Sequence, residues 1–146
     1  MLTRVDTYTI EQSSAVDRHP AGVLVVDDSR PFLALLRDVV RATRQLEPVG
    51  EAQSGEQAVE MTRKLHPDMV LIDVRMPGLG GIQAVNQIKA SHPTTLVALI
   101  STTHPDDLPA EADDSADAVI WKSELTPNLL DEIWRRYHDP GRPPNC

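Results

Sequence analysis

Residues 66–81 read HPDMVLIDVRMPGLGG, and the apolar run inside this stretch, Met69 to Ile72, is the strongest indication of the fold class. A run that is continuous, and does not alternate with polar residues, is typical of a parallel strand that is covered on both faces. Similar candidate strands recur along the chain in residues 23–26, 96–100, 118–121 and, as a less apolar segment, 47–52. The sequence therefore predicts five parallel strands.

The segments between these runs have the spacing of amphipathic helices. In residues 31–42 the apolar side chains recur every three or four positions. Ser54 to Gln57 has the form of a capping box, which begins a second helix. Two more helices are indicated by apolar residues at helical spacing around Val85 and after Pro127. Residues 104–117 contain few apolar side chains, so we expect only a short or mobile helix there.

Strands and helices thus alternate along the chain. This alternation predicts an α/β domain with a doubly wound, five-stranded parallel sheet and five helices, joined by right-handed crossovers. We expect the domain to span residues 21–138, between an N-terminal tail (residues 1–20) and a C-terminal tail (residues 139–146). The residues after Tyr137 are too few for an output domain, which favours a single-domain protein. The final GRPPNC also has the composition of a linker, so a longer protein would look the same here.

The composition excludes several classes of protein. A chain of 146 residues suits one domain, and a net charge of −8 disfavours non-specific binding to nucleic acid or anionic membranes. The one cysteine, Cys146, has no partner for an intramolecular disulfide, so we expect a protein of the reducing cytoplasm. No apolar run approaches the length of a membrane span, and the N-terminus lacks a secretory signal. Cationic proteins and metal ions are the favoured partners.

Polar residues follow four of the predicted strands at the point where each strand ends: Asp27 and Asp28, Asp73, Ser101 and Lys122. Because the carboxyl ends of parallel strands lie at one edge of a sheet, we expect these side chains to converge. Three neighbouring carboxylates repel one another unless a cation lies among them, and hard oxygen ligands suit Mg²⁺. With Mg²⁺ bound, a phosphoryl group can join the site. Asp73 would then form an acyl phosphate, and Ser101 and Lys122 would hold the transferring oxygens.

Four segments of the chain resemble, in order and spacing, the signature segments of response-regulator receiver domains. They are VLVVDDSR (23–30), HPDMVLIDVRMPGLGG (66–81), ALIST (98–102) and VIWK (119–122). The resemblance spans about residues 22–138. It implies a flavodoxin-like fold with strand order 2-1-3-4-5, and phosphorylation of Asp73.

The resemblance also implies the roles of the site residues and the partners. Asp28 and Asp73 would bind Mg²⁺ with the backbone carbonyl of Arg75, Asp27 would assist through water, and Ser101 and Lys122 would contact the phosphoryl oxygens. A sensor histidine kinase or a phosphotransfer protein would donate the phosphoryl group. An unidentified output protein would read the result, and a homodimer is a further option. We expect signalling by protein contact and no enzymatic activity.

Several positions depart from the family pattern, and two of them bear on the switch and on the backbone after the lysine. Val119 stands three residues before the lysine, where the family usually has an aromatic residue that turns inward on activation. Trp121 lies two residues further, on the same face of the predicted strand; we expect it to pack against the fourth or fifth helix, with a replacement role in the switch as the alternative. Ser123 follows the lysine where the family usually has a proline in a cis peptide, so we expect a trans bond here.

Simpler interpretations and other functions compete with this one. Acidic residues at strand ends are often solvated, Ser101 can cap the following turn, and Lys122 can be an exposed surface lysine. The site as a whole also fits a receiver-like binding module that is never phosphorylated. A Mg²⁺-dependent phosphatase with an aspartate nucleophile is less favoured, because its Asp-x-Asp arrangement is absent at both Asp27 and Asp73.

Residues 104–117 form the most acidic stretch of the chain. They hold six acidic side chains and no lysine or arginine. Such a stretch is either a solvated face or a docking surface for a basic partner, and the sequence is compatible with both.

Overall fold

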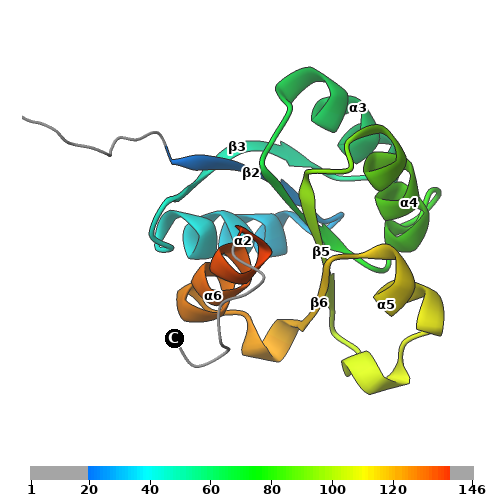
Figure 1. The fold of residues 1–146 in the computed structure, drawn as a ribbon. Coiled ribbons are helices and arrows are strands. Elements are labelled where there is room, and N and C mark those ends of the chain that lie inside the picture. Colours follow the sequence, from blue (N-terminus) through cyan, green and yellow to red (C-terminus); the bar gives the residue numbers. More distant parts are fainter. Residues whose placement is uncertain (1–19, 139–146) are drawn as a thin grey trace, which may run out of the picture.

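The structure is a computed structural model in which residues 20–138 are described. Figure 1 shows a central sheet with helices packed on both faces. The sheet has five parallel strands in the order β3-β2-β4-β5-β6. The strands are β2 (Ala21–Val26), β3 (Leu46–Ala52), β4 (Met69–Asp73), β5 (Leu96–Ser101) and β6 (Ala118–Trp121). The predicted fold class and the strand order 2-1-3-4-5 are confirmed.

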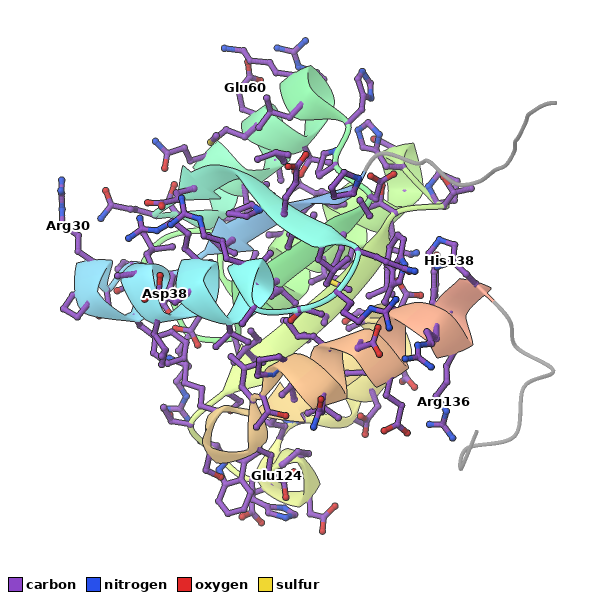
Figure 2. All side chains as sticks on the ribbon, turned by 90° about the vertical axis from the view of Figure 1, so that its left-hand side faces the viewer. Arg30, Asp38, Glu60, Glu124, Arg136 and His138 are labelled. Carbon is purple, nitrogen blue, oxygen red and sulfur yellow. The ribbon has the colours of Figure 1, made fainter. Side chains whose placement is uncertain are left out.

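Within residues 20–138, five α-helices and two short 3-10 turns connect the strands. They are α2 (Arg30–Arg41), α3 (Gly55–Leu65), α4 (Gly81–Ser91), η1 (Pro105–Asp107), α5 (Ala110–Ser115), η2 (Lys122–Glu124) and α6 (Pro127–His138). Helices α2 and α6 lie side by side on one face of the sheet, and α3, α4 and α5 cover the other (Figure 1 and Figure 2). Half of the predicted capping box is present at the start of α3, where Ser54 Oγ accepts a hydrogen bond from the N–H of Gln57. The Gln57 side chain accepts instead from the N–H of Gln53, one residue before the cap.

The three inner strands, β2, β4 and β5, are buried on both faces because each sends alternate side chains into two separate cores. In β4, Met69 and Leu71 contact the core beneath α2 and α6, whereas Val70 and Ile72 contact the core beneath α3 and α4. All four side chains are fully buried. The continuous apolar run in the sequence therefore arises, as predicted, because the strand is covered on both faces.

The less apolar candidate strand is present as β3, at one edge of the sheet. Its two terminal residues, Leu46 and Ala52, are buried, and the residues between them are partly or fully exposed. Pro48 has no N–H to donate, and it is tolerated because it lies at a register shift in the pairing with β2. The exposure of the residues between Leu46 and Ala52 explains why this strand lacks the continuous apolar run of the other four.

Residues 104–117 form only η1 and the six-residue helix α5, as their low apolar content predicts. Ala112 is the one buried residue of α5. Asp117 does not belong to the free acidic surface, because its carboxylate binds the Nζ of Lys89 and the N–H of Val97, each at 2.8 Å. The other acidic residues of the stretch are exposed: Asp106, Asp107, Glu111, Asp113 and Asp114.

Three further predictions concern the peptide bonds, membrane-spanning helices and the boundaries of the domain. All peptide bonds in residues 20–138 are trans, including the bond between Lys122 and Ser123. Across the same residues, every helix is too short or too polar to cross a membrane. The predicted tails, residues 1–20 and 139–146, fall outside the described residues apart from Pro20, so the domain boundaries stay a prediction.

Candidate functional site

Three carboxylates meet where β2 and β4 end. These strands are neighbours and pair Val26 with Ile72, so the residues that follow, Asp27 and Asp73, lie side by side. One carboxylate oxygen each from Asp27, Asp28 and Asp73 lies within 4.8 Å of the others. Asp27 and Asp73 are buried, with 1% and 7% of their surface exposed, whereas Asp28 is exposed. The structure therefore brings together the three aspartates that the sequence places at strand ends.

Lys122 supplies a positive charge to this cluster. It follows β6, and its Nζ lies 3.2 Å from Asp27 Oδ2 and 3.7 Å from Asp73 Oδ1. Its side chain is 16% exposed, which disagrees with the simpler interpretation of an exposed surface lysine. One ammonium group balances only one of the three carboxylate charges, so the electrostatics of the site favour a second cation.

Asp73 is the carboxyl group whose ionisation the site changes most clearly. Its pKa is raised to about 6, first by burial and then by the negative charge of Asp27. The ammonium of Lys122 and a hydrogen bond from the backbone N–H of Arg75 act in the opposite direction, and Asp28 adds a smaller upward effect. A divalent cation beside Asp73 would stabilise the carboxylate form and lower this pKa.

The residues present fit a Mg²⁺ ion. Mg²⁺ binds oxygen ligands at about 2.1 Å, so opposite ligands lie about 4.2 Å apart. The aspartate oxygens already lie within 4.8 Å of one another, and small side-chain movements would suffice to bring them onto one ion. Asp28 is exposed, which leaves a path for the ion and its waters. The N–H of Arg75 points to the Asp73 carboxylate, and the role of the Arg75 carbonyl as a ligand stays a prediction.

Ser101 lies at the same edge of the sheet but is engaged elsewhere. It follows Ile100, which pairs with Asp73 in the β4–β5 ladder. The Ser101 side chain is buried, and its Oγ accepts a hydrogen bond of 2.9 Å from the backbone N–H of Thr103. In this conformation Ser101 makes the turn-capping contact of the simpler interpretation. A hydroxyl that accepts this bond still has a proton to donate, so contact with a phosphoryl oxygen stays a prediction.

Val119 and Trp121 lie two residues apart in β6. Val119 packs against the core beneath α3 and α4. The indole Nε1 of Trp121 donates a hydrogen bond of 3.2 Å to the carbonyl of Thr102, and its ring lies edge-on to the ring of His104, with centroids 4.9 Å apart. Trp121 therefore packs against the loop between β5 and η1, where we expected a helix. This contact ties the end of β6 to the loop that follows β5.

The loop that follows Asp73 is held by close backbone packing. Gly81, the first residue of α4, has no room for a side chain, because a Cβ there would overlap the carbonyl oxygen of Asp73 and lie 2.8 Å from Val74 Cα. This close packing makes position 81 sensitive to any side chain.

We expect Gly81→Ala to lower the free energy of unfolding by about 1–3 kcal/mol, since backbone atoms cannot move aside as a flexible side chain can. Urea denaturation measures the change. Gly80→Ala is the matched control, because a Cβ there would meet only Gln83 Oε1 at 3.3 Å and Val74 O at 3.9 Å. Equal losses in the two variants would contradict this account.

Sequence reasoning missed one contact at the site. Phe32 is one of the apolar residues at helical spacing in the helix predicted for residues 31–42, and the structure places the Lys122 ammonium over its ring. The two residues lie on different elements far apart in the chain, so no local pattern could have indicated the contact.

Comparison with known proteins places the chain in a family. The family model described as "Response regulator receiver domain" matches residues 23–133. Over 120 residues the chain is 35% identical to a protein-glutamate methylesterase/protein-glutamine glutaminase 1 of Vibrio vulnificus (strain YJ016), a match that covers 82% of this chain and 29% of that protein. Among solved structures it is similar to the response regulator domain of Thermotoga maritima CheB, at 31% identity and a TM-score of 0.72, covering 82% of this chain and 98% of that one. It is also similar to the signal receiver domain of NarL from Mycobacterium tuberculosis, at 27% identity and a TM-score of 0.70, covering 80% and 98%.

These comparisons correct one prediction. The curated relative is named as an enzyme, so the expectation of a protein without enzymatic activity is wrong. The chain spans about 29% of the length of that relative, and the methylesterase and glutaminase activities are stated for that protein. The family model, by contrast, covers most of this chain, from residue 23 to residue 133, in the region that forms the sheet, its helices and the carboxylate cluster. The chain therefore belongs to the response regulator receiver domain family.

Proposed function

We propose that this domain accepts a phosphoryl group on Asp73 from the phosphohistidine of a histidine kinase or a phosphotransfer protein, with Mg²⁺ bound at the aspartates, and that it signals by protein contact. One observation carries the proposal. The buried Asp73 carboxylate lies beside two further carboxylates and 3.7 Å from the Lys122 ammonium, in a chain of the receiver family.

The arrangement supports each part of the transfer. A carboxylate oxygen of Asp73 bonds to phosphorus, the bond from phosphorus to the donor imidazole breaks, and the imidazole leaves with the electron pair. Mg²⁺ at Asp28 and Asp73, with Asp27 acting through water, would reduce the repulsion between the carboxylate and the phosphoryl oxygens. Lys122 and Ser101 lie at the same edge of the sheet and are proposed to hydrogen-bond the transferred group.

The output is proposed to arise from the loop after β5 and from α5. A phosphoryl group adds a charge of about −2 next to Lys122 and Ser101. Trp121 connects this edge to the loop through Thr102, and α5 has only one buried residue to hold it in place. A change at the site can therefore shift this surface between two arrangements. Its five exposed acidic residues favour a basic partner.

The experiment that tests the proposal is the intact mass of the protein after incubation with acetyl phosphate and Mg²⁺. We expect the mass of one phosphoryl group to be added, and no addition when Mg²⁺ is replaced by a chelator. A binding module that is never phosphorylated gains no mass under either condition. A phosphatase would instead release phosphate continuously from added phosphomonoesters.

Asp28→Ala tests the metal part of the proposal. The variant removes one hard anionic ligand from the cluster, so we expect the affinity for Mg²⁺ to fall by about tenfold to a hundredfold, measured by isothermal titration calorimetry. Asp38→Ala is the matched control, because Asp38 is an exposed aspartate on α2 outside the cluster (Figure 2). The same affinity in all three proteins would rule out a site at the aspartates.

A further inference from the structure

The Lys122 ammonium has a third partner besides the two carboxylates. Its Nζ lies 3.9 Å from the centroid of the Phe32 ring. Phe32 is in the first turn of α2, where Ser29 caps the helix by accepting a hydrogen bond of 3.4 Å from the Phe32 N–H. The ring is partly buried against the core beneath α2 and α6. The start of α2 therefore holds one aromatic face against Lys122.

This contact has the geometry of a cation–π interaction. The face of an aromatic ring attracts a cation within about 6 Å of its centroid, and the attraction grows when water is excluded. The Lys122 side chain is 16% exposed, so the ammonium is largely withdrawn from water. Its other two partners, Asp27 and Asp73, are the same groups that would serve a metal ion and a phosphoryl group. Of these three partners of Lys122, the Phe32 ring is the one that would neither bind the metal ion nor react with the phosphoryl group.

We propose that Phe32 is a positioning residue, which keeps the Lys122 ammonium beside Asp73 while the carboxylates change partners. This inference rests on the proposed function, because the step it serves is phosphoryl uptake. With acetyl phosphate as donor, an Asp73 oxygen bonds to phosphorus, the bond from phosphorus to the acetate oxygen breaks, and acetate leaves with the electron pair. Lys122 donates a hydrogen bond to a transferring oxygen during this step, provided that its ammonium stays in place.

A series of fluorinated phenylalanines at position 32 tests the proposal. One, two and three ring fluorines weaken the attraction for a cation step by step and leave the ring shape nearly unchanged. We expect the rate of phosphoryl uptake from acetyl phosphate, at saturating Mg²⁺, to fall with each fluorine and to reach about a fivefold loss at three. We expect the Mg²⁺ affinity to stay the same across the series. Phe32→Leu should match the trifluoro protein, and Phe32→Tyr should retain the rate of the unchanged protein.

Val39→Ala is the matched control for lost packing. Val39 lies on α2 and is partly buried against the same core as Phe32. The variant should lower the free energy of unfolding without changing the uptake rate. An uptake rate that ignores fluorination, or that falls as much in Val39→Ala, would overturn the positioning role while leaving the proposed function intact. Failure of the unchanged protein to take up any phosphoryl group would overturn both.

A second measurement tests the contact without phosphorylation. Protons held over an aromatic face are shifted upfield in the NMR spectrum, so the ε-methylene signals of Lys122 should lie upfield of those of exposed lysines. Phe32→Leu should abolish this displacement, and Phe32→Tyr should keep it. Signals of Lys122 that are the same with Phe32 and with Leu at this position would show that the ring does not hold the ammonium.

Discussion

We expect Asp73→Asn to take up no phosphoryl group from acetyl phosphate and Mg²⁺, whereas the unchanged protein should gain one. The reason is chemical, because the amide oxygen is a far poorer nucleophile than the carboxylate oxygen that it replaces. The variant is nearly isosteric, and Asp73 is 7% exposed, so the fold has no reason to change. Intact mass measures the uptake, and circular dichroism checks the fold.

The matched control for this variant is Asp38→Asn. Asp38 is an exposed aspartate on α2 and lies outside the carboxylate cluster. We expect this variant to gain the phosphoryl group at the rate of the unchanged protein. Uptake by Asp73→Asn at an unchanged rate would show that another residue is the acceptor.

The same substitution should stabilise the protein at neutral pH in the absence of Mg²⁺. The Asp73 carboxyl ionises at about pH 6 in the folded state, because burial and Asp27 raise its pKa. In the unfolded chain an aspartate ionises near pH 4. Below about pH 4 both states are protonated and Asp73 has no effect on stability. As the pH rises from about 4 to about 6, the unfolded state is ionised first, so the stability of the unchanged protein falls relative to Asp73→Asn.

We expect this difference in the free energy of unfolding to grow from near zero below pH 4 to about 2–3 kcal/mol above pH 7, since one unit of pKa shift corresponds to about 1.4 kcal/mol. Urea denaturation of both proteins across this pH range measures the difference. The other titrating groups are the same in both proteins, so their contribution to stability drops out of the difference. Added Mg²⁺ should stabilise the unchanged protein more than the variant, because the ion favours the carboxylate form of Asp73. A difference that stays constant from pH 4 to pH 8 would contradict the raised pKa.

The fold could be predicted from the sequence because the sheet is covered on both faces. Every side chain of β4 is buried, so the strand has to be apolar throughout and is visible as a run. At the edge strand β3 the burial alternates, and the signal was correspondingly weaker. The short helix α5 was also predictable, because a segment with few apolar residues cannot bury a full helical face.

The candidate site was predictable only where topology alone decides proximity. The carboxyl ends of parallel strands lie at one edge of the sheet, which is why Asp27, Asp73 and Lys122 could be assigned to one place, although β5 separates β4 from β6. Contacts that depend on side-chain rotamers, or on helices packing against distant strands, cannot be predicted from the spacing of residues in the sequence. The ring of Phe32 over Lys122 and the pairing of Asp117 with Lys89 belong to this second kind.

The enzyme prediction failed for a different reason. It was drawn from the site, which has the features of a signalling acceptor, and from the small number of residues left outside the domain. The curated relative shows that a receiver domain with 35% identity to this chain can occupy 29% of an enzyme. The properties of a receiver site therefore carry no information on what the rest of a protein does.

The most direct test of the central claim locates the phosphoryl group within the chain. Borohydride reduces an aspartyl phosphate to the alcohol, which releases phosphate and turns the aspartate into homoserine. After treatment of the protein with acetyl phosphate, Mg²⁺ and borohydride, tandem mass spectrometry of its peptides should find homoserine at position 73 and aspartate at positions 27 and 28. Homoserine at any other position, with unmodified Asp73, would contradict the assignment of Asp73 as the phosphoryl acceptor.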